Sequence, residues 1–313
     1  MKKIIPYLLV LISVNLYSQS SADAGLCSII MNKNDKESNF NYNYSIGLGV
    51  GENSVILNNY KMTLFYSPLD KMTFFIGLPF SVVSGDLGKQ TGVGDLDLGI
   101  QYSLELANKH KIRYSMSLKS SLDRDPRYKI FPSGIAEPLP MVYQPSLGND
   151  NLIVIVDYIF DEWDIAGGVL IPFSQPNKNK YVSNQDLKNT IVPYIFDNYT
   201  SSAGLTRGTD IMLKASREIY KNDKFTINAG VNPIYRLGNN QIEFIENGVV
   251  KSLEIENSGG LVLNLFGSVD YNLNNESYLT FTLGFPVLKR SNPNDGLYRI
   301  FQSSLSITGN ILR

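Results

Sequence analysis

The stretch Leu96-Asp97-Leu98-Gly99-Ile100-Gln101-Tyr102-Ser103-Leu104-Glu105-Leu106 decides the fold class, because an apolar side chain occupies every even position. Such alternation is typical of a β-strand with one apolar and one polar face. Residues 111–121 repeat the pattern after a short polar interruption. A strand that crosses a bilayer needs about 9–11 residues, whereas strands of soluble sandwiches usually have about 5–6. The two stretches therefore predict membrane-spanning strands.

The rest of the chain contains further segments of the same kind. An even number of strands is typical of single-chain bacterial barrels. We therefore predict an all-β fold, a transmembrane antiparallel up-and-down β-barrel of about twelve strands over residues 42–313. The predicted strands are 42–51, 55–67, 71–83, 95–107, 111–121, 151–160, 162–173, 208–220, 224–236, 260–272, 277–288 and 297–311.

The connections between these segments alternate in length. Outer-membrane barrels have short periplasmic turns and longer external loops, so this alternation predicts that both termini face the periplasm. Aromatic residues gather beside the short turns, where an interfacial girdle is expected. The short turns are 67–70, 107–111, 161–162, 221–223 and 273–276, and the others are 52–54, 84–94, 122–150, 174–207, 237–259 and 289–296; the aromatic residues are Tyr66, Tyr158, Phe160, Trp163, Tyr220, Tyr271 and Tyr278.

The N-terminus has the pattern of a secretory signal peptide. Lys2 and Lys3 precede an apolar run over residues 4–14, and small and polar residues follow near Ser18. The run is shorter than the roughly 20 residues of a spanning helix, so we predict that residues 1–19 are cleaved.

The segment after the signal, residues 20–41, lacks strand alternation. It can fold into the lumen as a plug or extend into the periplasm as a tail, and apolar Leu26, Ile29 and Ile30 favour the plug. Cys27 is the only cysteine, which excludes an internal disulfide, and we expect a small buried thiol.

Charge and residue content exclude several function classes. The chain has 28 Lys and Arg against 29 Asp and Glu, with no basic block, so we expect no nucleic-acid partner. His110 is the only histidine and lies in a short turn. One histidine in a turn cannot supply a catalytic triad or an imidazole-rich metal site. It also differs from the strand-borne histidine that outer-membrane phospholipases need. We predict no enzyme activity, no cofactor and no metal.

Alternation places several charged and polar side chains on the inner face of the strands. If a hairpin turns about residues 108–109, Glu105 lies near Arg113, and Asp97 lies near Lys119. Facing acids and bases can select solutes through a transverse field, but paired charges also fill a narrow barrel, and we favour this structural role. The candidate lumen-lining residues are Lys61, Asp97, Gln101, Glu105, Arg113, Lys119, Lys214, Glu218 and Asp270.

Residues Gly92-Val93-Gly94-Asp95-Leu96-Asp97-Leu98 carry a resemblance to a known family. A Gly-x-Gly-Asp start to an alternating strand resembles the outer-membrane transporter-like family associated with meta-pathway phenol degradation, which is similar in turn to the fatty-acid transporter group. The resemblance implies a monomeric barrel that passes small hydrophobic molecules and holds its N-terminal segment in the lumen. The end at Arg313 departs from the terminal aromatic residue of many outer-membrane barrels.

Three functions follow from these observations. The first is a passive outer-membrane channel or transporter for small hydrophobic solutes, monomeric and in contact with outer-membrane lipid. The second is a non-conducting barrel whose outer loops bind a partner or surface ligand. The third is a soluble secreted β-rich binding protein, which the membrane length of the strands disfavours.

Overall fold

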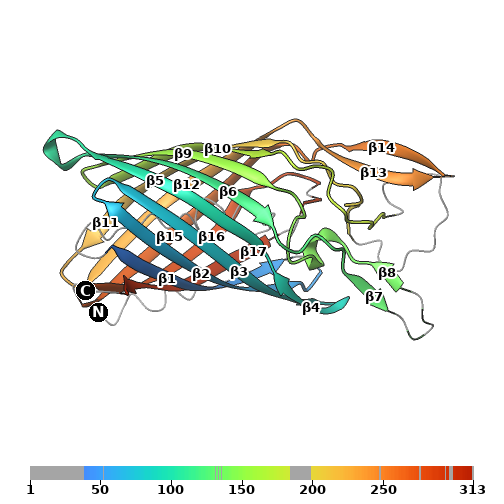
Figure 1. Ribbon diagram of the computed structural model, residues 1–313, viewed down its shortest axis with the longest axis horizontal. Coiled ribbons are helices and arrows are strands. Elements are labelled where there is room, and N and C mark those ends of the chain that lie inside the picture. The colour runs from blue at the N-terminus through green and yellow to red at the C-terminus, as the bar shows by residue number, and fades with distance from the viewer. Residues whose placement is uncertain are drawn as a thin grey trace.

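The computed structural model describes residues 39–311 except 52, 131, 133, 135, 184–198, 247, 275, 293 and 296–298. In this described part, twelve long antiparallel strands close into a barrel (Figure 1). The β1–β17 and β2–β3 pairings complete the ring. In ring order the strands are β1 (Phe40–Gly51), β2 (Ile56–Leu69), β3 (Met72–Gly85), β5 (Asp95–Glu105), β6 (Lys111–Ser121), β9 (Asn151–Phe160), β10 (Trp163–Pro172), β11 (Thr209–Lys221), β12 (Phe225–Leu237), β15 (Gly260–Asn274), β16 (Ser277–Leu288) and β17 (Arg299–Asn310).

The predicted barrel is confirmed strand by strand, and no boundary differs from its prediction by more than two residues. The long connections hold additional short elements that alternation did not reveal. They extend the sheet or form separate hairpins beyond the barrel, where no bilayer requires a long strand. These elements are β4 (Gly88–Val93), β7 (Tyr128–Ile130), β8 (Ala136–Pro138), β13 (Asn240–Glu246), β14 (Val249–Ile255) and the 3-10 turn η3 (Met141–Tyr143). A further 3-10 turn, η2 (Ala107–Lys109), lies in the short turn between β5 and β6.

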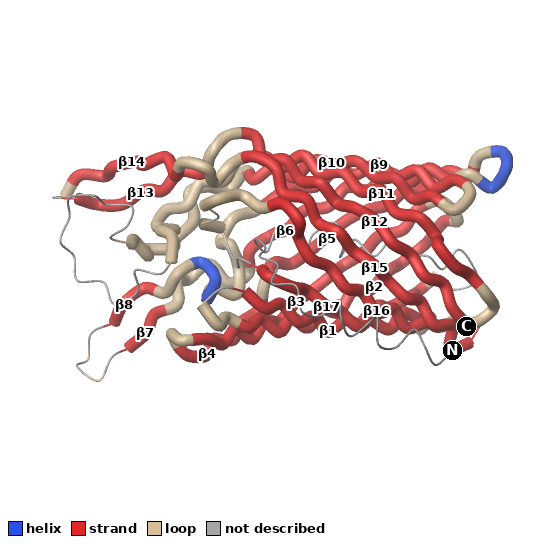
Figure 2. The backbone as a smooth tube through the Cα atoms, turned by 180° about the vertical axis from the view of Figure 1, so that it is seen from behind, coloured by secondary structure: helices blue, strands red, loops and turns tan. Residues whose placement is uncertain are grey.

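The two ends of the barrel differ, as Figure 2 shows. The long connections gather at one end, called the loop end below, and hairpins β13–β14 and β7–β8 project beyond it. The short turns lie at the opposite end, called the turn end. Asn41 of β1 pairs with Asn310 of β17, so the first strand begins and the last strand ends together at the turn end.

The outer face of the barrel is apolar. Ile76, Leu98 and Met116 are among many large apolar side chains that stay exposed on it, which is the pattern of a lipid-facing band. At the turn end, the Phe40 and Tyr66 rings stack with centroids 4.6 Å apart. Two other aromatic pairs lie beside other short turns, one on β9 and one on β12 and β15. The predicted aromatic girdle is therefore present in the fold.

No helix among the described residues is both long and apolar enough to cross a membrane.

The predictions for the N-terminus lie outside the described residues, which begin at Asn39. They concern the signal peptide over residues 1–19, nearly all of the segment 20–41, and Cys27. They stay predictions.

The connections at the loop end are folded into two small apolar cores. One core joins the ends of β2 and β3 to residues of the connections 122–150 and 174–207. The other joins these connections to the β13–β14 hairpin. We call the described parts of the connections the cap. The cores are Val55, Val83, Leu87, Leu139, Tyr143 and Tyr181, and Met141, Leu147, Leu205, Ile242 and Ile255.

Candidate functional site

A first charged group lies inside the barrel on β2, β5 and β6. Lys61 Nζ lies 3.1 Å from Asp97 Oδ2, although β3 separates their strands. Gly77 of β3 makes this contact possible, because a Cβ atom there would lie 2.8 Å from Lys61 Cε. Lys119 pairs in register with Asp97, as predicted. One buried carboxylate is thus placed between two lysines.

A second charged group lies on the neighbouring strands β6, β9, β10 and β11. Arg113 of β6 lies opposite Asp157 of β9, and its Nε and Nη2 lie 2.7 and 2.6 Å from Asp157 Oδ2. Next to this pair, Lys214 Nζ of β11 lies 2.7 Å from Asp164 Oδ2 of β10. Two cations therefore lie beside two carboxyl groups, and both members of the Arg113 pair are almost fully buried.

The predicted contact between Glu105 and Arg113 is wrong. The β5–β6 hairpin pairs Glu105 with Lys111 and places Ser103 opposite Arg113. Glu105 is the last residue of β5, so it lies at the turn end and is exposed. Arg113 instead takes its partner Asp157 from the strand on its other side.

The remaining candidate residues do not join these two groups. Gln101 is buried and donates to Ser103 Oγ at 3.3 Å. Asp270 is buried and accepts a hydrogen bond from Thr280 Oγ1 at 2.6 Å. Glu218 lies near the turn end, where its carboxylate is 3.2 Å from Lys221 Nζ. The nine candidates are thus spread over several levels of the barrel.

An apolar patch covers one side of the barrel interior toward the loop end. Its seven side chains come from five consecutive strands, β9 to β12 and β15, and each is at most 3% exposed. Continuous apolar sequence over residues 152–156 is the signal for it, since both faces of β9 are apolar there. We call this patch the apolar wall: Ile153, Ile155, Ala166, Leu170, Met212, Ile234 and Val262.

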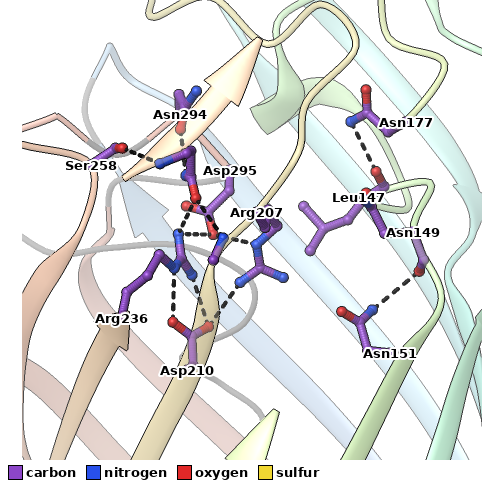
Figure 3. Close-up of polar contacts among 12 residues, drawn as sticks. Leu147, Asn149, Asn151, Asn177, Arg207, Asp210, Arg236, Ser258, Asn294 and Asp295 are labelled. Atoms are coloured by element: carbon purple, nitrogen blue, oxygen red, sulfur yellow. Dashed lines mark hydrogen bonds and ion pairs between the residues drawn. The ribbon is translucent and has the colours of Figure 1, made fainter. Parts of the chain in front are cut away.

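A third charged group, the mouth cluster, lies next to the apolar wall, because the pair Asp210 and Arg236 precedes the wall pair Met212 and Ile234. Figure 3 shows four of its members, Arg207, Asp210, Arg236 and Asp295. Asp210 of β11 and Arg236 of β12 are paired in register, and Arg236 Nε and Nη2 lie 2.8 Å from the two Asp210 oxygens. Connections from the loop end supply the other members. The cluster is Arg207, Asp210, Arg236, Arg290 and Asp295, all with side chains at most 2% exposed.

Asp295 enters the mouth cluster from the connection between β16 and β17. Its Oδ2 lies 2.9 Å from Arg207 Nε and 2.8 Å from Arg236 Nη1. Burial by itself would raise the pKa of the Asp295 carboxyl, but the guanidinium groups of Arg236, Arg207 and Arg290 together hold it well below its usual range. Asp295 is therefore ionised at neutral pH.

Sequence reasoning missed the apolar wall, both carboxylates of the second group and the whole mouth cluster. Asp157 and Asp164 occupy inward positions of predicted strands, so alternation by itself could have found them. Asp210 and Arg236 stand at strand ends, where the distinction between strand and loop is weakest. Asp295 lies in a predicted loop, and no periodicity marks it.

His110 lies at the turn end, as predicted. Its Nδ1 is 2.9 Å from the Tyr158 hydroxyl, and its Nε2 is 3.9 Å from Asp161. Within the described ranges, no group of three or more His, Cys, Asp or Glu side chains could hold a metal ion.

The barrel is similar to solved outer-membrane proteins. The COG4313 outer membrane channel from Pseudomonas putida F1 aligns with a TM-score of 0.55 at 17% identity, over 88% of this chain and 96% of that one. This chain has the β-barrel fold of that channel. The resemblance that begins at Gly92 is thereby confirmed at the level of fold.

Two further solved barrels align over most of this chain with lower scores. The translocator domain of the autotransporter NalP from Neisseria meningitidis has a TM-score of 0.47 at 9% identity, over 95% of this chain and 99% of that one. The CymD monoaromatic hydrocarbon channel has a TM-score of 0.44 at 9% identity, over 95% and 94%. No family model and no curated protein matches the sequence.

Proposed function

We propose that this protein is a passive channel for small hydrophobic solutes across the bacterial outer membrane. It acts as a monomer in contact with outer-membrane lipid, with both termini and the turn end in the periplasm and the loop end outside. No reaction is catalysed. The nine inward polar candidates line the path together with the apolar wall.

The apolar wall is the observation that carries this proposal. The interior of a water-filled porin is polar, because apolar side chains exposed to water cost about 25 cal/mol per Å². Here seven apolar side chains from adjacent strands form one patch on the inner face. Such a surface binds an apolar solute better than a hydrated ion or a sugar, because the apolar solute removes water from the surface.

The first and second charged groups complement this role. Lys61, Asp97 and Lys119 lie on one side of the interior, and Arg113, Asp157 and their neighbours lie on another. Because nearly all charges of these two groups have partners, the two groups offer no strong trap for a passing ion. A neutral apolar solute does not need to break these pairs.

The test is transport by the refolded protein in lipid. We expect discrete conductance steps in a planar bilayer, with larger steps for a variant that lacks residues 20–41 if that segment is a plug. Vesicles should take up a small apolar solute faster than a sugar of similar size. Silence of both forms together with equal uptake by empty vesicles would overturn the proposal.

A matched pair of variants examines the apolar wall. Ile234→Ser changes a fully buried wall residue, whereas Tyr235→Ser changes its exposed neighbour on the lipid side. We expect slower apolar uptake only for Ile234→Ser, with folding checked by heat-modifiable gel mobility. Equal uptake by the two variants would argue against the wall as part of the path.

The folded cap favours a second function, a non-conducting barrel that binds a partner through its loops. The cap has two apolar cores of its own, and exposed Ile130, Ile245 and Val250 lie on its projecting hairpins. This function predicts a silent barrel in the bilayer whether or not residues 20–41 are present.

A further inference from the structure

Arg207 and Arg236 are held between two carboxylates of different origin (Figure 3). Asp210 belongs to the barrel wall, where its two oxygens bind Arg236 at 2.8 Å each, and its Oδ2 lies 3.0 Å from Arg207 Nη2. Asp295 belongs to a connection and approaches both guanidinium groups through one oxygen. The position of the Asp210 carboxylate is fixed by strand pairing, whereas Asp295 is not part of the sheet.

The charges of the mouth cluster do not balance. Among the described residues, the five side chains of the cluster carry three positive charges, on Arg207, Arg236 and Arg290, and two negative charges, on Asp210 and Asp295. The Asp95 carboxyl acts on Arg207 from outside the cluster, so the cluster itself has one positive charge in excess. All five side chains are buried. Removal of the Asp295 carboxylate would leave an excess of two, and buried charge of one sign is costly unless an anion compensates it.

Arg207 carries an unused donor. Arg207 Nη1 is buried and has no hydrogen-bond partner within the described ranges, although the Arg207 side chain is fully covered. A buried guanidinium nitrogen without an acceptor costs free energy. The cluster thus has both the charge and the donor to hold a further carboxylate oxygen.

The surface next to the arginines is apolar. On β11 and β12 the pair Asp210 and Arg236 is followed on the same face by the pair Met212 and Ile234, since side chains two apart share a face. Val262 pairs with Ile234 on the next strand. A molecule whose carboxylate contacts the arginines would place its body against these three side chains.

We infer that Arg207 and Arg236 form a binding site for a solute carboxylate, and that Asp295 occupies this site as an internal competitor. The ligand class is a compact apolar molecule with one carboxylate. Charge-assisted hydrogen bonds to guanidinium groups supply the recognition, and the apolar wall accepts the rest of the molecule. The inference rests on the proposed channel function, because the channel brings solutes to this position.

The experiment measures benzoate binding to the refolded full-length barrel in detergent micelles by titration calorimetry. Asp295→Asn removes the competitor without changing side-chain size, so benzoate should bind at least about tenfold tighter than to the wild type. Benzyl alcohol, which keeps the ring and lacks the charge, should bind equally to both. Asp123→Asn, which removes a carboxylate paired with Arg127 elsewhere in the cap, is the matched control and should leave benzoate binding unchanged.

A third variant, Arg207→Gln, should lose most benzoate affinity in the Asp295→Asn background. If it does not fold, the comparison of Asp295→Asn with the wild type decides alone. The inference fails if Asp295→Asn binds benzoate no tighter than the wild type, or if benzyl alcohol gains as much as benzoate. Because binding is measured in micelles and conduction in bilayers, a silent barrel that still binds benzoate would overturn only the channel function.

Discussion

Replacement of Arg113 by Met should strongly destabilise the barrel. The Arg113 and Asp157 side chains are 4% and 0% exposed, and two nitrogen atoms of Arg113 lie within 2.7 Å of one carboxylate oxygen. Removal of one member of such a buried pair leaves the other charge without its partner, which costs about 3–5 kcal/mol. Asp164 lies on the adjacent strand and adds a second negative charge to the same region.

The matched control is Lys221→Met. Lys221 is paired with Glu218 at a similar distance, but its side chain is 64% exposed, and exposed pairs contribute about 0–1 kcal/mol. The two variants therefore remove the same kind of charge from a buried and an exposed pair. The expected difference between them is at least about 2 kcal/mol.

The assay is equilibrium unfolding in denaturant with the barrel in lipid vesicles. The chain has one tryptophan, Trp163, which lies at the turn end and is partly exposed on the lipid side, so its fluorescence reports the loss of the barrel. A double variant with Asp157→Leu should recover most of the lost free energy, because it removes the unpaired carboxylate. A loss for Arg113→Met as small as that for Lys221→Met would refute the reasoning.

Three further predictions concern the mouth cluster, the first charged group and the apolar wall. Because the folded-state pKa of Asp295 is depressed, its charge stabilises the protein above the unfolded value of about 3.9 and this contribution is lost as the pH falls toward the folded value. The loss of unfolding free energy caused by Asp295→Asn should thus be equal at about pH 8 and about pH 6, and it should become smaller below about pH 4. A loss that becomes larger as the pH falls would contradict this prediction. Asp97→Asn leaves Lys61 uncompensated, so the reversal potential in a KCl gradient should shift toward anion selectivity, with Asp125→Asn in the cap as the unchanged control. A Cβ atom on Gly168 would lie 2.7 Å from Ile155 Cγ1, so Gly168→Val should lower the free energy of unfolding by about 1–3 kcal/mol. A Cβ atom on Gly284 would lie 3.8 Å from its nearest neighbour, so Gly284→Ala should leave that free energy unchanged.

The sequence by itself determined the strands, their number and the two unlike ends of the barrel. Alternation is a local property, since each side chain points to the face opposite its neighbour whatever the rest of the chain does. The length of the alternating segments then reflects the thickness of the bilayer. For this reason the segment 95–106 and its neighbours could be predicted without any knowledge of the fold.

Sequence determined the inner face but not the contacts across it. Asp97 was predicted near Lys119 correctly, because a hairpin links the two strands directly. The predicted contact of Glu105 with Arg113 did not share that register, in which Glu105 pairs with Lys111, and the register of a hairpin is set by its turn. The partner of Arg113 lies beyond a long connection, and alternation carries no information about that distance along the chain.

Only the tertiary structure decided which charges meet. Lys61 reaches Asp97 across a strand because Gly77 lies between them, and this depends on the stagger of three strands. Arg207 and Asp295 meet at the loop end through connections that have no periodicity. The physical reason is that closure and stagger of a barrel are properties of all its strands together, whereas the side-chain pattern of each strand is its own.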